Sequence, residues 1–368
     1  MTALNSQLRA TTQAMIERAG VDTTTPATGP DGAVWTALTE AGFTGIGIPE
    51  DYDGSGGTLA DALAVVSAAV TGGALTMLVE HTVLAGWLAA RCGISLGAHT
   101  STIAVADQGT VIREAEDGRP VLDGSARAVV HGPDADRLVV LLDPHAADHH
   151  PAVALLSPTA PGVTGSSGAD LLGAAVSDYE FDAAPVESYA QSPVGGAELG
   201  QRGALAYTVA SAAAARAVCD RTVDYAGQRT QFGRPLSKFQ AVQQRLAGLA
   251  GLTALMETAA ETAVAETSGA GPDRAQTAVA AAKVVTAESA REVAAAGHQL
   301  HGAIGFTAEH PLGRSTTALL SWRERYGSER YWADVLAGRI LEGGADVWDL
   351  VTGSGHEDNS AAAEGNNR

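Results

Sequence analysis

Two short segments carry side chains suited to holding a ligand that contains phosphate and a flat ring. In RTQFG, Arg229 offers the planar fork that binds a phosphate through two hydrogen bonds, and Phe232 offers an aromatic face. In QLHGAIG, Gln299 carries both a donor and an acceptor, and Gly302 lets the backbone approach a ligand closely. These four residues are the first candidates for a binding site.

A second group of candidates lies in LLDPHAADHHP, whose carboxylates and imidazoles are Asp143, His145, Asp148, His149 and His150. Such groups bind metal ions, but this spacing lacks the rigid scaffold that a metal site requires. We interpret the stretch as a solvated loop between strands and expect no metal.

The composition and charge of the chain exclude several classes of function. The chain has 368 residues, a formal net charge of −19 and 45% hydrophobic residues, which is enough apolar material for a sizeable core. The acidic excess argues against nucleic acid as a partner, because phosphate binding needs clustered cations. No apolar run is long enough for a membrane span, and the N-terminus lacks a secretory signal pattern. Cys92 and Cys219 therefore indicate reduced thiols in a cytoplasmic protein.

The elements that must position the candidate residues fall into three parts and a tail. Residues 1–100 show helical apolar spacing and predict an N-terminal helical domain. Residues 101–196 alternate β-branched runs with turn residues and predict a small antiparallel β domain. Residues 197–352 predict a C-terminal four-helix bundle, and the polar residues 353–368 predict a disordered tail.

Individual elements follow from the same patterns. Helices are predicted over Leu75–Arg91, Ala204–Ala226, from Leu236 onward, from Pro272 to His301, and over Ser315–Arg325 and Ser328–Leu341. Strands are predicted over Thr102–Ala106, Val111–Ala115, Arg119–Gly124, Ser125–Val130, Arg137–Leu142, Ala152–Leu156 and Val176–Asp182.

Three motifs follow one another along the chain. They are GIGIPEDYDGSGGT (45–58), QRTQFGRPLSKFQ (228–240) and HQLHGAIGFTAEHPLGR (298–314). The second closely resembles the R-x-x-F-G signature of the acyl-CoA dehydrogenase family, which ends in a glutamine, and the third resembles the family's Q-x-x-G-G segment. With the order of helical, β and helical parts, the chain is similar to this family over nearly its whole length.

The resemblance implies an oligomeric flavoprotein that acts on acyl-CoA and passes electrons to an electron-transfer flavoprotein. In this family the matching residues reach across a dimer interface to the FAD of the neighbouring subunit. The FAD contacts implied here are Arg229, Phe232, Gln240, Gln299, Gly302 and Ala303.

The catalytic base of the family has no counterpart at its usual place. Most members use a glutamate after the Q-x-x-G-G segment, and the ungapped match places Tyr326 there, a poor base at neutral pH. Other members place the base at the start of the first bundle helix, where this chain has Gln201. Glu198, Glu324 and Glu329 are the remaining weak candidates for a relocated base.

The β domain also departs from the family pattern. The loops that hold the flavin ring in the family are replaced by VADQGTVIREAEDG after the first strand and by HGPDADRLV after SARAVV. The chain thus resembles the base-less subunit of actinobacterial heterotetrameric (α2β2) acyl-CoA dehydrogenases of steroid side-chain degradation. This implies a subunit that is not itself catalytic and completes the FAD site of a homologous partner.

Two other functions remain open on the sequence. One is a self-sufficient flavoenzyme of the same fold, either a dehydrogenase with a relocated base or a flavin monooxygenase. The other is a structural or interaction protein that has lost flavin, against which the joint presence of Arg229, Phe232, Gln299 and Gly302 argues.

Overall fold

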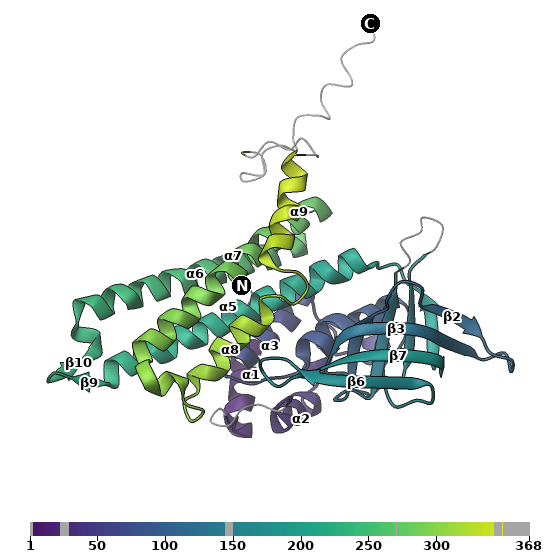
Figure 1. Ribbon diagram of the computed structural model, residues 1–368, viewed down its shortest axis with the longest axis horizontal. Helices are drawn as coiled ribbons and strands as arrows, with labels where there is room; N and C mark the ends of the chain where they lie inside the picture. The colour runs from purple at the N-terminus through teal and green to yellow at the C-terminus, as the bar shows by residue number, and fades with distance from the viewer. Residues whose placement is uncertain (1–2, 23–28, 144–149, 270, 342–347, 349–368) are drawn as a thin grey trace, which may run out of the picture.

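The computed structural model describes residues 3–22, 29–143, 150–269, 271–341 and 348. The molecule is elongated, with long helices forming one arm and a β domain forming the other (Figure 1). The N-terminal helices lie beneath the junction of the two arms (Figure 1). The fold class predicted from the sequence is confirmed in this order of parts.

The N-terminal part contains the helices α1 (Ala3–Ala19), α2 (Gly32–Glu40) and α3 (Leu59–Thr71). The start of α3 is fixed by a capping box, in which Thr58 and Asp61 satisfy each other's backbone N–H groups. The helix predicted over Leu75–Arg91 begins only at Leu78 and ends as predicted, and its first part is the π-helix η3 (Val79–Gly86), which continues into α4 (Trp87–Arg91). A π-turn inside a helix often marks a functional position.

The β domain contains two four-stranded sheets, in the orders β1-β4-β5-β8 and β2-β3-β7-β6. The strands are β1 (Ser101–Val105), β2 (Val111–Glu114), β3 (Pro120–Val130), β4 (Arg137–Leu142), β5 (Ala152–Leu156), β6 (Val163–Ala169), β7 (Ala175–Pro185) and β8 (Ser188–Gln191). All pairs are antiparallel except β1 with β4, which run parallel. A separate apolar core, including Leu122, Leu138 and Phe181, lies between the sheets.

Three features of the β domain differ from the sequence prediction. The runs Arg119–Gly124 and Ser125–Val130 form the single strand β3, whose register shifts at two places. The strand β6, with the sequence VTGSSGA, was not predicted because it is exposed along most of its length and lacks an alternating apolar pattern. The short strand β8 was missed for the same reason.

The C-terminal part is built on α5 (Gly196–Gln228), α6 (Gln240–Gly269) and α7 (Pro272–His301). A hairpin of β9 (Thr230–Gln231) and β10 (Arg234–Pro235) joins the first two of these helices. The shorter helices α8 (Leu312–Trp322) and α9 (Glu329–Leu341) complete this part. The middle of α5 is almost all alanine and is buried, so neighbouring helices pack closely on it.

The predicted bundle helices have shifted ends. The helix α5 begins eight residues before Ala204, and α6 begins at Gln240 because residues 236–238 form a 3-10 turn after Pro235. The proposed disordered tail, 353–368, lies outside the described residues. Among the described residues, no helix is long and apolar enough to cross a membrane.

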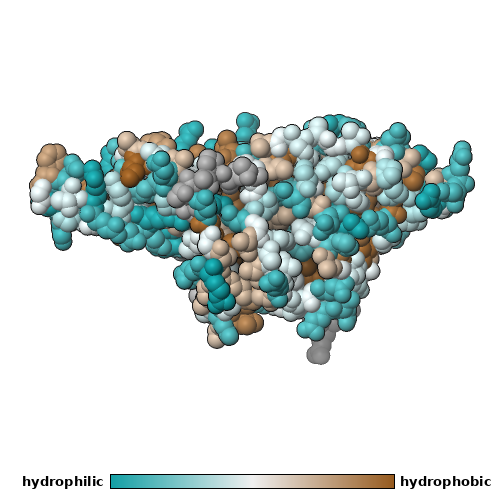
Figure 2. Space-filling model, turned by 90° about the horizontal axis from the view of Figure 1, so that it is seen from below, coloured by the Kyte–Doolittle hydropathy of each residue, from teal (hydrophilic) through white to brown (hydrophobic). Residues whose placement is uncertain are grey.

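The β9–β10 hairpin and α9 lie far from each other along the arm of long helices. The β9–β10 hairpin lies at its far end, whereas α9 rises from the end near the β domain (Figure 1). Seen from below, hydrophobic residues are scattered among hydrophilic ones over this face (Figure 2). The candidate site therefore has to be located from particular residues.

Candidate functional site

The two sequence segments that suggested a ligand site meet at the far end of the helical arm. Tyr225, one turn before the end of α5, stacks on His301 with ring centroids 4.4 Å apart. Its hydroxyl also donates to the His301 carbonyl at 3.4 Å. His301 is the last residue of α7 and directly precedes Gly302. These contacts bring the α5 end, with Arg229, beside the α7 end, with Gln299 and Gly302.

The hairpin after α5 presents an aromatic ring to the exterior. Phe232 and Gly233 both have positive φ angles, 52° and 78°, as expected for the two central residues of a type I′ hairpin turn. Phe232 is 92% exposed, although its ring centroid lies 6.2 Å from that of Phe239. The guanidinium of Arg234 lies over the Phe239 ring at 4.1 Å and fixes the base of the hairpin.

Gly302 adopts a backbone conformation that other residues rarely reach. Its angles are φ 65° and ψ −144°, in a region almost restricted to glycine. A Cβ placed there would meet no atom of this chain within 4 Å. The glycine therefore leaves open space at the end of α7, where a ligand's atoms could approach the backbone.

The six predicted FAD contacts share one property, which is exposure to the exterior. They are Arg229, Phe232, Gln240, Gln299, Gly302 and Ala303. A guanidinium, an aromatic face, amides and a glycine with free space fit a cofactor that carries a pyrophosphate and flat rings. A group held by these side chains would lie outside the core of this chain.

Sequence reasoning missed the histidines that shape this end. His301 is buried, and its Nδ1 lies 2.8 Å from the Gly297 carbonyl while Nε2 has no partner among the described residues. Burial lowers the pKa of His301, so the ring is neutral at physiological pH. His298 stacks on Phe306 at 4.3 Å, and its Nε2 lies 2.9 Å from the Thr316 hydroxyl. Their closeness to Gln299 and Gly302 in the sequence was the only available signal.

The position expected for the base is occupied by an aromatic ring that packs against the core. Tyr326 stacks on Tyr207 of α5 with centroids 6.0 Å apart, and its carbonyl accepts a 2.9 Å hydrogen bond from the Trp332 indole. Gly203 of α5 faces the same ring, because a Cβ built there would lie 2.4 Å from it. Burial raises the pKa of the Tyr326 phenol far above its usual value, so it cannot serve as a base near neutral pH.

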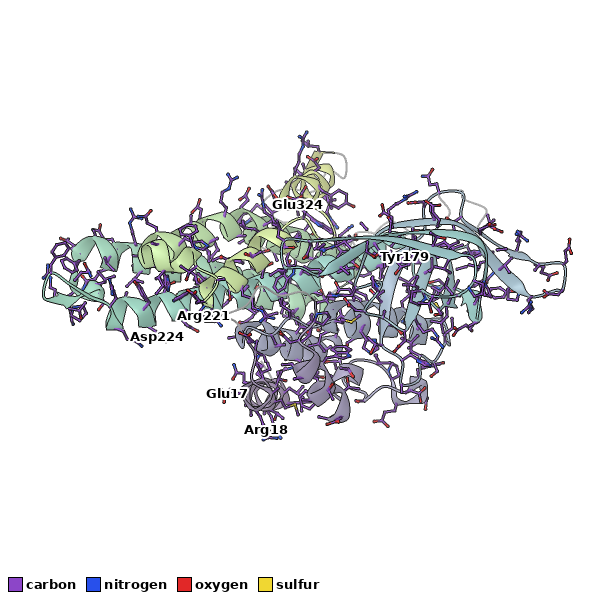
Figure 3. The ribbon with its side chains drawn as sticks, turned by 60° about the horizontal axis from the view of Figure 1, so that its bottom comes forward. Glu17, Arg18, Tyr179, Arg221, Asp224 and Glu324 are labelled. Atoms are coloured by element: carbon purple, nitrogen blue, oxygen red, sulfur yellow. The ribbon has the colours of Figure 1, made fainter. Side chains whose placement is uncertain are left out.

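The weak candidates for a relocated base lie elsewhere. Glu198 lines a different cavity, together with Gln201. Glu324 is exposed at the turn that leads to α9, as Figure 3 shows. Glu329 forms an ion pair with Arg323. Although burial opposes it, the hydrogen bond from Arg323 leaves the pKa of Glu329 below its usual value. The α5 residue that faces the Tyr326 ring is Gly203, which carries no side chain.

One buried carboxylate near Tyr326 was not predicted. Glu80 of the π-helix is 2% exposed, and its carboxylate accepts a hydrogen bond from the Tyr207 hydroxyl. Burial and the charge of Glu80 raise the pKa of Tyr207, so the phenol remains a donor. The sequence signal was a lone glutamate in the apolar run MLVEHTVLAG.

Glu80 and Tyr207 line a small, partly open cavity, whose wall also carries the ion pair of Asp170 with Arg325. The carboxylate of Asp170 accepts from the Arg325 guanidinium at 3.0 Å and from the Ser321 hydroxyl at 2.8 Å. The cavity has a volume of about 40 Å³, enough for roughly two or three water molecules. This interior therefore has no room for an acyl chain.

The β domain provides little to hold a flavin ring. Only residues 106–110 connect β1 to β2, and polar groups there bond to β3, as when Thr110 donates to the Ser125 carbonyl at 3.1 Å. After β3, His131 has a φ of 58° and its Nδ1 lies 3.0 Å from Asp134. Polar groups of both connections are thus engaged within the β domain.

The metal-ligand candidates do not gather into a site in the described part of the chain. Asp143 accepts a hydrogen bond from the backbone N–H of Gly196 at 2.5 Å, at the start of α5. His145, Asp148 and His149 lie outside the described residues. Over the ranges the structure describes, no three His, Cys, Asp or Glu side chains lie together as metal ligands.

Comparisons with known proteins agree with this architecture. Residues 2–96 match the acyl-CoA dehydrogenase N-terminal domain, and residues 201–350 match the C-terminal domain of that family. The chain is 32% identical to the acyl-CoA dehydrogenase FadE27 of Mycobacterium tuberculosis over 308 residues, which cover 77% of this chain and 81% of FadE27. It is 28% identical to the acyl-CoA dehydrogenase IpdE2 of Mycolicibacterium smegmatis, over 77% of this chain and 80% of the relative.

Solved structures show the same fold. A chain of the ChsE4-ChsE5 complex from Mycobacterium tuberculosis superposes with a TM-score of 0.77 and 26% identity, over 93% of this chain and 98% of that one. Butyryl-CoA dehydrogenase from Megasphaera elsdenii superposes with a TM-score of 0.81 and 19% identity, over 93% and 99% of the two chains.

Proposed function

Because this chain belongs to the acyl-CoA dehydrogenase family, we propose that it is the non-catalytic subunit of a heteromeric acyl-CoA dehydrogenase. In that reaction a carboxylate base removes the α-proton of the thioester, and FAD supplies the acceptor for the β-hydride. This chain would contribute FAD contacts to a homologous partner that supplies the base. Such an assembly would be α2β2.

The observation that carries the proposal is the filled position at Tyr326. A base must approach the substrate on the face opposite the flavin, so it needs both a carboxylate and an open space beside it. Here the Tyr326 ring packs against Gly203, which itself has no side chain. The nearest buried carboxylate, Glu80, is held by Tyr207 in a cavity that admits only water.

The exposed end of the helical arm supports the second half of the proposal. Arg229 would bind a pyrophosphate oxygen, and Gln299 would satisfy polar atoms of the cofactor. Both side chains face the exterior, together with Phe232. They would therefore act on a flavin whose ring is held by another subunit, since the short β1–β2 connection of this chain offers no cradle.

The substrate and partners follow from the same proposal. The acyl-CoA thioester would bind in the partner's active site, and electrons would leave to an electron-transfer flavoprotein. A homologous partner subunit is supported by the ChsE4-ChsE5 complex, whose title names two chains. A steroid side-chain substrate is supported by similarity to a structure entitled Tcur3481-Tcur3483 steroid ACAD, at 22% identity and a TM-score of 0.78.

Flavin content tests the proposal. The protein is purified alone, and also after co-expression with a base-carrying acyl-CoA dehydrogenase encoded beside its gene, and flavin is measured by absorbance. We expect a colourless single protein and a yellow complex with about one FAD per pair of subunits. Stoichiometric flavin on the protein alone, with dehydrogenase activity, would refute the proposal and favour the self-sufficient enzyme.

A matched pair of variants sharpens this test. Arg229→Ala in the complex should lower the flavin content, whereas Arg330→Ala should leave it unchanged. Arg330 is an exposed arginine on α9, far from the hairpin in the sequence and in the fold. Equal flavin content in both variants would show that this chain does not hold the cofactor through Arg229.

A further inference from the structure

A second cavity lies near the opposite end of the helical arm from the hairpin. It has a volume of about 440 Å³, within the usual range of about 300–1,000 Å³ for small-molecule sites. Its walls come from the start of α5, the end of α6, the start of α7 and Trp87 of α4. Arg202, at this cavity, and Arg229 are separated by 27 positions along α5, or about 40 Å at the helical rise.

The cavity contains one guanidinium with donors to spare. Arg202 stacks on the Trp87 indole at 4.1 Å, and its Nε donates to the Val83 carbonyl at 2.7 Å. Its other two nitrogens have no hydrogen-bond partner among the residues that the structure describes. Burial lowers the pKa of Arg202 to about 9, so the group is still charged at neutral pH. The stacked ring and the Val83 carbonyl fix its position.

The acidic side chains that line this cavity favour a ligand with a single negative charge over a phosphate group. Asp273 pairs with Arg339 at 3.1 Å, so its charge is balanced. Glu198 is exposed at the cavity, and its negative charge acts on Arg202 across it. This carboxylate would repel a dianion more strongly than a monoanion. A carboxylate matches the fork of Arg202 and carries a single charge.

The rest of the wall suits an apolar body. Leu59, Leu205 and Val279 line the cavity beside the Trp87 ring. The polar amide of Gln276 is already engaged, because its oxygen accepts from Arg339 at 2.7 Å. A ligand would thus find one cationic group beside an apolar wall, with polar side chains such as Gln201 and Thr267 on the rest of the lining.

We propose that this cavity is a binding site for a small amphiphilic carboxylate, with Arg202 holding the carboxylate and Trp87, Leu205 and Val279 contacting the apolar body. The ligand would bridge the N-terminal helices and the bundle. It would stabilise their packing by mass action, because it binds only the folded arrangement. This inference is independent of the proposed function, since the cavity shares no residue with the flavin-binding end.

Calorimetric titration of the full chain with octanoate tests the site, with 1-octanol as the probe that lacks the charge. We expect saturable octanoate binding with a Kd below about 1 mM and at least tenfold weaker binding of octanol. Equal affinity for both probes, or no saturable binding of octanoate, would overturn the proposal.

Two variants with opposite expected effects keep the test independent of folding. Arg202→Gln should weaken octanoate binding by at least about tenfold, since a charge-assisted bond is lost. Glu198→Gln should tighten it by about threefold, because the competing carboxylate is removed from an exposed position that the fold does not need. A gain in affinity cannot come from a damaged fold. Unchanged octanoate affinity in Glu198→Gln, together with unchanged affinity in Arg202→Gln, would contradict the site.

Discussion

The flavin-motif end of the helical arm and the region around Tyr326 were both singled out by the family resemblance of the sequence, yet their surfaces are opposite in character. At the end of the arm, polar and aromatic groups such as Arg229, Phe232 and Gln299 face the exterior. Around Tyr326, aromatic rings pack on α5 and the remaining cavity admits only water. The first region presents its groups to the exterior, whereas the second packs against the core.

This difference indicates where the function of the chain would reside. A buried ring gives stability whether or not a ligand is present. An exposed arginine and an exposed phenylalanine at a strained turn give little to the isolated chain, so their presence is explained best by an external group. Variants of each region should therefore change different properties.

The largest expected effect is on stability, from removal of the Tyr326 ring. Tyr326→Ala should lower the free energy of unfolding by about 3–4 kcal/mol, because a packed aromatic side chain leaves a cavity. Tyr326→Phe keeps the ring and should cost less than about 1 kcal/mol. Urea denaturation of the isolated protein measures both. Similar losses in the two variants would mean that the ring does not pack as a core residue.

The free energy of unfolding should also depend on pH, by about 3 kcal/mol at most, through the buried residue Lys283. Lys283 is 1% exposed and donates to the Trp322 carbonyl at 3.1 Å, just before the segment that carries Tyr326. Burial lowers its pKa to about 8, so the unfolded chain binds more protons than the folded chain between pH 8 and about 10.5. Stability contributed by this group must then rise with pH across that window.

A comparison of the wild type with Lys283→Met isolates the pH-dependent stability that Lys283 contributes. The wild type should gain stability relative to the variant as the pH rises from 8 to about 10, as measured by urea denaturation at each pH. Parallel stability curves for the two proteins would show that Lys283 titrates normally.

At the flavin-motif end, the expected change is in cofactor affinity and not in stability. Arg229→Ala should weaken FAD binding to the complex by about 2 kcal/mol, or roughly 30-fold, because one charge-assisted pair is lost. Titration of the flavin-free complex measures this, with Arg330→Ala as the control. The urea midpoint of the isolated Arg229→Ala protein should not move, since the side chain is exposed. A large fall in that midpoint would remove the contrast between the two regions.

The smallest expected effect concerns the glycine that faces Tyr326. Gly203→Ala should destabilise the protein by about 1–2 kcal/mol, because the new Cβ would lie 2.4 Å from the ring. Gly200→Ala, on the same helix with no atom within 4 Å of its Cβ, should stabilise it by up to about 1 kcal/mol. In a Tyr326→Ala background the cost of Gly203→Ala should disappear. Its persistence there would place the clash elsewhere.

The fold and the family could be predicted because they depend on patterns repeated over many residues. The alanine-rich run of α5 and the Pro272 start of α7 are local signals of helices. The strand β6 could not be predicted, because Gly and Ser in an exposed strand carry no alternation. The π-helical form of Val79–Gly86 within the predicted Leu75–Arg91 helix also has no local signal.

The sequence by itself determined the order of parts and the motif residues, and it predicted Tyr326 at the position of the usual glutamate, since each is a matter of residue type and spacing. Tertiary structure decided that Gly203 faces Tyr326, that Glu80 meets Tyr207 and that Arg202 stacks on Trp87. These pairs lie more than 100 positions apart in the chain. Their contacts depend on how whole helices pack, which no local spacing specifies.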